Sequence, residues 1–200
     1  MKLGLFGGTF DPPHIGHLVL ASEAYDQLGL DRVLWILTHY PPHKIGQPIM
    51  PLAERLNMLQ AAIDNDPAFE LSRVDIDRPP PHFAVDTVRL IREQYPRDKL
   101  VYLMGGDSLM DLPEWHNPHE FILACDELGV MHRPDETVNM DALEARLPGL
   151  TTRVRFMQAP LLEISSSQIR QKITHKKPYR YFLPEAVFRL IRERYLYLRI

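Results

Sequence analysis

The chain has 200 residues, of which 45% are hydrophobic and 24% charged, a composition typical of a soluble globular protein. Its formal net charge of −3 argues against a large nucleic-acid-binding surface, and its single cysteine excludes an internal disulfide. No apolar run approaches the roughly 18 residues of a membrane span, and Leu3–Phe6 is too short for a signal peptide, so we expect a cytoplasmic protein with neither a membrane nor a nucleic-acid partner.

The predicted elements alternate between short buried strands and amphipathic helices. Strands are expected at Lys2–Phe6, Arg32–Leu37, Phe69–Val74, Leu100–Met104, Leu128–Met131 and Val154–Met157. Helices are expected at His17–Leu28, Leu52–Ile63, Val85–Tyr95, Ile164–Ile173 and Pro184–Tyr195, with Gly29 as a C-cap. This alternation predicts parallel strands joined by right-handed crossovers, hence a three-layer α/β sheet. No repeat or linker divides the chain, so residues 1–200 are interpreted as one domain with a helical part at about 160–200.

The segment after the first strand, GGTFDPPHIGH at Gly7–His17, has the features of a phosphate site. Its two leading glycines let the backbone approach a ligand closely. The helix that follows presents unpaired N–H groups to an anion, and His14 and His17 can donate to a phosphoryl oxygen. Three alternatives stay open on residue types alone: a pair of metal ligands, two satisfied polar residues, or a tight strand-to-helix turn.

Taken together with later segments, Gly7–His17 resembles the signature of the nucleotidyltransferases that carry a T/HxGH motif, and the chain is similar to the bacterial nicotinate mononucleotide adenylyltransferases over nearly its whole length. The matching segments are PPHK at Pro41–Lys44, GGD at Gly105–Asp107, LPEWH at Leu112–His116, Arg133-Pro134, and ISSSQIR at Ile164–Arg170. The resemblance implies a Rossmann-like, doubly wound fold of the adenine nucleotide alpha hydrolase-like kind, with C-terminal helices. One segment departs from the family, because His82-Phe83-Ala84 replaces a Ser-Tyr-Thr-like triplet.

The resemblance also implies a reaction: transfer of the adenylyl group of ATP to nicotinate mononucleotide, giving deamido-NAD and pyrophosphate. The attacking group is the phosphate of the mononucleotide, so no covalent enzyme intermediate is expected, and Mg²⁺ is the implied cofactor, bound through the ATP phosphates. The residues that the resemblance implies as catalytic are His14, His17, Lys44 and Arg170.

The implied binding residues fall into two sets. Those for ATP are Gly7, Gly8, Thr9, Phe10, His17, Gly105, Asp107, Arg133, Ile164, Ser165, Ser166 and Arg170. Those for the mononucleotide are Thr9, Lys44, Phe83, Ala84, Asp86, Thr87 and Trp115.

Several of these residues also have an alternative role that involves no ligand. Lys44 can be a solvent-exposed lysine, Asp107 a helix N-cap and Trp115 a core residue. Arg170 can be a surface arginine on a capped helix. Nicotinamide mononucleotide and phosphopantetheine are the alternative acceptors. A class I aminoacyl-tRNA synthetase shares the tetrapeptide HIGH but needs a KMSKS-like loop, which the sequence lacks. The oligomeric state is left open, with a homodimer or a higher oligomer to consider.

Overall fold

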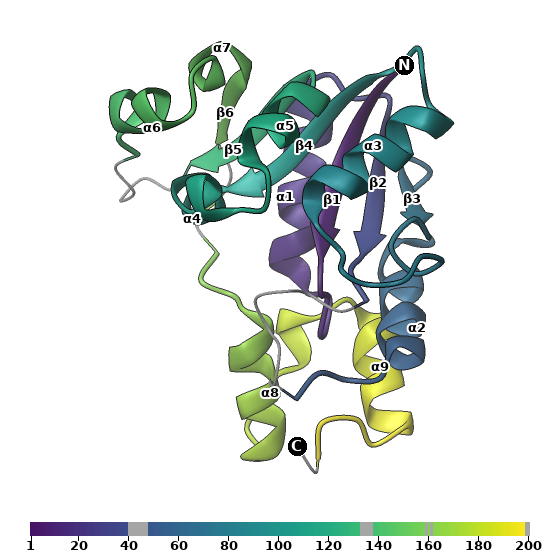
Figure 1. Cartoon of the computed structure of the whole chain (residues 1–200). Helices are drawn as coiled ribbons and strands as arrows, with labels where there is room; N and C mark the ends of the chain where they lie inside the picture. The colour runs from purple at the N-terminus through teal and green to yellow at the C-terminus, as the bar shows by residue number, and fades with distance from the viewer. Residues whose placement is uncertain (40–47, 133–137, 159, 161, 199–200) are drawn as a thin grey trace.

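The computed structural model describes residues 1–39, 48–132, 138–158, 160 and 162–198. Lys44 and Arg133 lie outside these ranges. Within them, six strands form one sheet in the order β3-β2-β1-β4-β5-β6, and all neighbouring pairs are parallel (Figure 1). The strands are β1 (Lys2–Gly8), β2 (Arg32–Leu37), β3 (Phe69–Ser72), β4 (Lys99–Gly105), β5 (Glu127–His132) and β6 (Val154–Gln158). Because the order reverses between β1 and β4, the sheet is doubly wound, as predicted.

Each predicted helix is present, with ends that differ by at most two residues from those expected. The long helices are α1 (Ile15–Gln27), α2 (Leu52–Ile63), α3 (Ala84–Gln94), α8 (Ser166–Thr174) and α9 (Glu185–Glu193). Short elements that the sequence pattern did not predict are α4 (Gly106–Met110), η2 (Leu112–Glu114), α5 (Pro118–Ala124), α6 (Met140–Arg146), α7 (Leu150–Arg153) and η3 (Arg180–Phe182). Gly29 follows α1 with a φ of 58°, the left-handed conformation that favours glycine after a helix C-terminus.

The sheet is buried on both faces because alternate side chains of each strand enter different apolar clusters. In β2, Leu34 and Ile36 belong to the cluster that includes residues of α3 and α5. Val33, Trp35 and Leu37 belong to the cluster that includes residues of α1 and α2. This period of two explains why the strand reads as a continuous apolar run, and it gives the three layers that the alternation of elements predicts.

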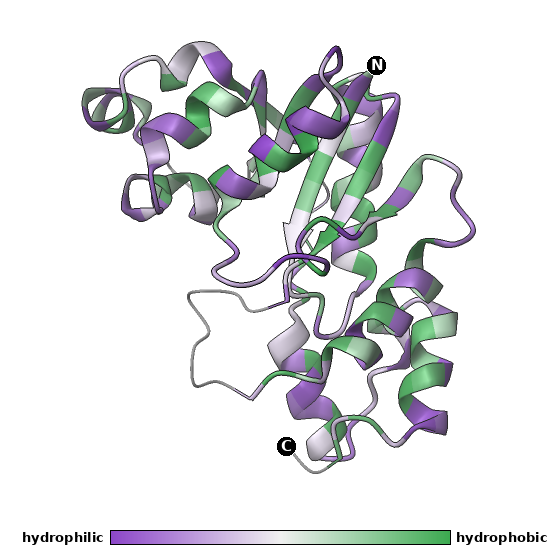
Figure 2. Ribbon diagram, turned by 45° about the vertical axis from the view of Figure 1, so that its right-hand side comes forward, coloured by the Kyte–Doolittle hydropathy of each residue, from purple (hydrophilic) through white to green (hydrophobic). Residues whose placement is uncertain are grey.

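Helices α8 and α9 lie beyond the carboxyl ends of the strands, where α9 packs beside α2 (Figure 1). A third apolar cluster joins them, with Met58 of α2, Ile169 of α8 and Val187 of α9 among its buried members. Green and purple residues alternate along these helices in Figure 2, as expected for helices with one buried face. None of the helices described is both long and apolar enough to cross a membrane.

Candidate active site

The first loop, which we define as Thr9–His14, leaves the carboxyl end of β1 and leads into α1, so that His14 is the N-cap residue of that helix and His17 lies in its first turn. The two imidazole rings stack with centroids 3.6 Å apart and an interplanar angle of 22°. The backbone N–H of His14 donates to Nδ1 of His17 over 3.1 Å. Because Nδ1 of His17 accepts, the neutral ring carries its proton on Nε2, where it is a hydrogen-bond donor.

His14 is a buried histidine, with 6% of its surface exposed. Burial lowers the pKa of His14 to about 4 from its ordinary value of 6.5, so the ring is neutral at physiological pH. Among the described residues its Nδ1 has no hydrogen-bond partner. A buried nitrogen without a hydrogen-bond partner costs free energy, which the stacking on His17 and the position at the N-terminus of α1 must offset.

Arg55 of α2 anchors the first loop through hydrogen bonds to backbone carbonyl oxygens, a role that the sequence analysis did not predict. Its side chain is 1% exposed. Nη1 donates to the carbonyl oxygens of Thr9 at 3.0 Å and Thr38 at 2.8 Å. Nη2 donates to the carbonyl oxygen of His39 at 2.9 Å, and Nε to that of Met50 at 3.0 Å. One guanidinium thus holds the first loop, the end of β2 and the entrance to α2 together.

The beginning of α8 lies against the same loop. Ser165 caps the helix by accepting from the backbone N–H of Gln168 at 3.2 Å. The Ser166 hydroxyl donates to the carbonyl oxygen of Pro12 at 2.8 Å. Arg170 lies one turn further, and its Nη1 donates to the carbonyl oxygen of Asp11 at 2.7 Å. Two segments more than 150 residues apart in sequence therefore meet at one loop.

The remaining ATP-binding predictions lie mostly on neighbouring strand ends. Gly105 ends β4, and a Cβ added there would meet no atom within 4 Å, so the space in front of it is open. Asp107 lies in the first turn of α4 and is exposed. Phe10 differs from these residues, because its ring is 2% exposed and contacts Phe6 and Trp35 in the apolar core. We therefore expect only the backbone of Phe10 to be available to a ligand.

The predicted mononucleotide residues gather around the start of α3. Phe83, the N-cap residue of α3, stacks on His116 with ring centroids 3.9 Å apart. Ala84 opens the helix, and both it and Asp86 are half-buried. Trp115 is half-buried too, with its ring 5.2 Å from that of Phe121, so it lies at the edge of the core.

Thr87 forms hydrogen bonds with the loop that precedes α3. Its hydroxyl donates to Oδ1 of Asp75 at 2.7 Å. The same carboxylate pairs with Arg78, whose Nη2 lies 2.9 Å from Oδ1. Thr87 and Asp75 are both 3% exposed. The Thr87 hydroxyl is therefore engaged in a buried polar network that shapes the loop, a use that the motif itself does not reveal.

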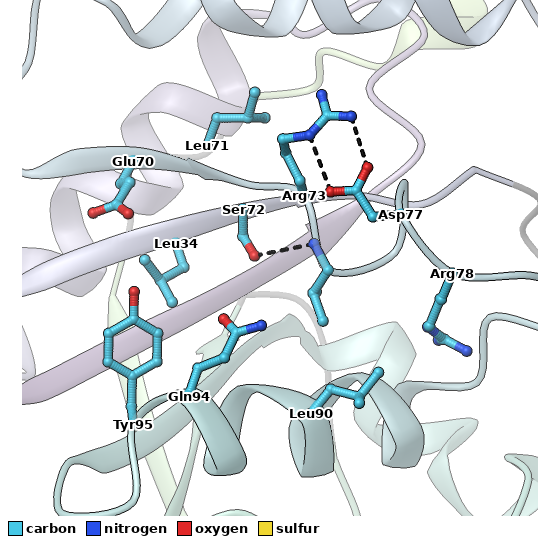
Figure 3. A pocket seen from close by; sticks show the side chains of 11 residues that line it. Leu34, Glu70, Leu71, Ser72, Arg73, Asp77, Arg78, Leu90, Gln94 and Tyr95 are labelled. Atoms are coloured by element: carbon cyan, nitrogen blue, oxygen red, sulfur yellow. Dashed lines mark hydrogen bonds and ion pairs between the residues drawn. The ribbon is translucent and has the colours of Figure 1, made fainter.

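A surface pocket lies beside the edge strand β3 and along α3 (Figure 3). Arg73 and Asp77 line it and pair with each other, with Nη2 and Oδ1 2.7 Å apart. Arg78, which also lines it, pairs with Asp75. None of the predicted site residues lines this pocket. Because its arginines are already paired, we assign it no role in catalysis.

Comparison with known proteins places this geometry in a family. Residues 5–172 match the family model described as cytidylyltransferase-like. The probable nicotinate-nucleotide adenylyltransferase of Thermomicrobium roseum is 44% identical over 98% of this chain and 91% of its own length. The nicotinate-nucleotide adenylyltransferase of Bacillus subtilis is 37% identical over 98% of each chain.

Solved structures agree on the fold. The nicotinic acid mononucleotide adenylyltransferase of Plasmodium falciparum complexed with NaAD superposes with a TM-score of 0.79 at 16% identity, covering 98% of this chain and 97% of that one. The putative nicotinate-nucleotide adenylyltransferase of Vibrio parahaemolyticus has a TM-score of 0.68 at 18% identity, covering 100% of this chain and 98% of that one. The chain therefore belongs to the cytidylyltransferase-like family and, within it, to the nicotinate-nucleotide adenylyltransferases.

Proposed function

We propose that this chain transfers the adenylyl group of ATP to nicotinate mononucleotide in NAD biosynthesis. A phosphate oxygen of the mononucleotide attacks the α-phosphorus of ATP, the bond from the α-phosphorus to the bridging oxygen breaks, and pyrophosphate leaves with deamido-NAD as the other product. The observation that carries this proposal is the meeting of the His14–His17 stack, the N-terminus of α1 and Arg170 at one loop. All three supply hydrogen bonds or positive potential to phosphates.

Catalysis then consists of positioning two anions in line and stabilising the charge at the transferred phosphoryl group. We propose that Nε2–H of His17 donates to an ATP phosphate oxygen, and that neutral His14, stacked on it, fixes its ring. Arg170 and Lys44 would neutralise the phosphate chain. Mg²⁺ would enter as part of the ATP substrate and offset negative charge on its phosphate oxygens.

We place the mononucleotide between the first loop and the start of α3. The backbone of Gly7, Gly8 and Thr9 would bind its phosphate. Trp115 would stack on the pyridine ring. Because Phe83 and Ala84 lack the hydroxyls common in the family, the carboxylate of nicotinate would accept from backbone amides at the N-terminus of α3. An amide in place of that carboxylate gains less from these donors, which favours the acid substrate.

We also propose a cytoplasmic location. A chain with a single cysteine has no internal disulfide, so its fold does not depend on an oxidising compartment.

The experiment that tests the function is a pyrophosphate-release assay with ATP and Mg²⁺, in which nicotinate mononucleotide, nicotinamide mononucleotide and phosphopantetheine are compared as acceptors. We expect the highest kcat/KM with nicotinate mononucleotide. Release with phosphopantetheine alone, or with none of the three, would overturn the proposal. A preference for nicotinamide mononucleotide would keep the reaction and reverse the selectivity.

A further inference from the structure

Asp11 is a buried carboxylate of the first loop that the proposed mechanism does not use. Its side chain is 3% exposed. Oδ1 accepts from the Tyr197 hydroxyl at 2.7 Å, and Oδ2 accepts from the backbone N–H of Met50 at 3.3 Å. A buried charge of this kind is tolerated only when hydrogen bonds compensate it. Asp11 therefore joins the first loop to the segment that precedes α2 and to the segment that follows α9.

Tyr197 is built into the C-terminal cluster rather than placed on the surface. It is 2% exposed, and its hydroxyl also lies 3.9 Å from Sδ of Met58. Its φ is 65°, an unfavourable value for a tyrosine that the surrounding packing must maintain. Burial, reinforced by the negative charge of Asp11, raises the pKa of Tyr197 well above its ordinary value. The hydroxyl thus keeps its proton and donates to Asp11 throughout the physiological pH range.

The same carboxylate faces Arg170. Nη1 of Arg170 donates to the Asp11 carbonyl oxygen at 2.7 Å but lies 3.9 Å from carboxylate Oδ2. The guanidinium is thus beyond hydrogen-bonding distance of the carboxylate, although its charge is near enough to be attracted strongly in a buried setting. The donors from Tyr197 and Met50 offset part of the carboxylate's charge. Removal of either donor would increase the attraction on Arg170.

We propose that Tyr197 is a positioning residue whose hydroxyl satisfies Asp11 and thereby keeps Arg170 on the loop backbone, available to the phosphates of ATP. Without that hydroxyl, Arg170 would move onto the Asp11 carboxylate and lose its contact with ATP. This inference rests on the proposed function, since it takes Arg170 as a phosphate-binding residue. It links the segment after α9 to ATP binding through one hydrogen bond of 2.7 Å.

The first test compares Tyr197→Phe with Tyr195→Phe. Both substitutions remove one hydroxyl from the same segment, but the Tyr195 side chain is 75% exposed. We expect Tyr197→Phe to raise the KM for ATP about tenfold to a hundredfold, the effect of losing one charged hydrogen bond, while the KM for the mononucleotide changes less than twofold. Tyr195→Phe should leave both constants unchanged. An equal KM for ATP in Tyr197→Phe and the wild type would overturn the inference.

The second test asks whether the effect passes through Arg170, which a merely structural role would not require. In an Arg170→Gln background, Tyr197→Phe should cause no further rise in the KM for ATP. An equal rise in both backgrounds overturns the inference. An Arg170→Gln enzyme with wild-type KM for ATP also overturns it, while adenylyl transfer by the wild type would still support the proposed function. Absence of transfer by the wild type would instead remove the function.

If Tyr197→Phe does not fold, we would test a double variant in which the buried carboxylate of Asp11 is removed as well. Asp11→Asn/Tyr197→Phe leaves no carboxylate to attract Arg170, so we expect its KM for ATP to lie within about threefold of the wild-type value. A larger increase in this double variant, with unfolding by urea confirming that it is folded at the assay temperature, contradicts the proposed competition for Arg170.

Discussion

The backbone N–H of His14 donates to Nδ1 of His17, so the first histidine fixes the ring orientation and the tautomer of the second. The stacking of the two rings adds a second restraint. In the mechanism that we propose, this arrangement presents Nε2–H of His17 to the phosphates before ATP arrives. A donor that is already oriented costs no reorganisation when charge develops.

His17→Ala should therefore affect turnover more than binding. Loss of one preorganised donor to developing negative charge typically costs a factor of about 10²–10³ in rate, and we expect a decrease in kcat of that size. The dissociation constant for ATP should change much less, because Arg170 and the backbone amides remain. Steady-state kinetics and equilibrium ATP binding check this prediction. His119→Ala, at an exposed position, is the control. A wild-type kcat in His17→Ala at saturating substrates contradicts the assigned role.

The buried His14 predicts a specific dependence of stability on pH. Its pKa is lowered from 6.5 to about 4 by burial, so between these values the unfolded chain binds a proton that the folded chain does not. Stability is therefore complete above pH 6.5 and falls as the pH decreases toward 4. This single group accounts for a loss approaching about 3 kcal/mol.

The free energy of unfolding in urea at pH 7 and pH 5 measures this dependence. His14→Asn, which keeps a residue suited to an N-cap, should show a smaller decrease between the two pH values than the wild type. His119→Asn should show the wild-type decrease, because that side chain is exposed. If His14→Asn loses as much stability as the wild type, His14 does not titrate as described.

Substitution of Trp115 tests whether its ring contacts the mononucleotide or only packs in the core. Base or pyridine stacking on an aromatic ring is worth about 1–3 kcal/mol, so Trp115→Ala should raise the KM for nicotinate mononucleotide about fivefold or more, with little change in the KM for ATP. The same substitution also removes contacts to Phe121 and will lower stability. Kinetics at a temperature where the variant is folded separate the two effects. A lower stability with an unchanged KM would assign Trp115 to the core alone.

Arg55→Met should be among the most destabilising substitutions in the chain. It removes a buried cation that donates to four backbone carbonyl oxygens and leaves those acceptors without their partner. Breaking buried polar interactions of this kind costs about 3–5 kcal/mol. Arg73→Met is the matched control, because that arginine is 53% exposed and its ion pair with Asp77 should contribute at most about 1 kcal/mol. Urea unfolding of both variants measures the difference.

Much of this molecule could be predicted from local patterns. The continuous apolar run in Arg32–Leu37 and the helical period of Leu52–Ile63 depend on neighbours in sequence, and both elements have the predicted bounds. The Gly7–His17 motif likewise placed its two histidines beside a helix N-terminus. Short elements such as α4 and α7 were missed because four or five residues are too few to show a period.

The residues that hold the loops of the site in place could not be predicted, because the groups that they bind are remote in sequence. Arg55 donates to the backbone carbonyl oxygens of Thr9 and Thr38. Every residue has such a carbonyl, so the sequence does not show which carbonyls a distant arginine binds. The one local signal was an arginine on the apolar face of Leu52–Ile63. The Thr87 hydroxyl donates to Asp75 across a loop. The sequence motif alone could not show whether this hydroxyl stabilises the fold or binds a ligand.

The hydrogen bond from Tyr197 to Asp11 spans 186 residues of sequence. Contacts of such long sequence separation form late in folding, because the entropy of closing the intervening loop must be overcome first. The sheet can therefore assemble before the first loop is secured. A nascent or refolding chain would form native-like secondary structure before it becomes fully active. The delay between the two would measure how long the segment after α9 takes to dock on the first loop.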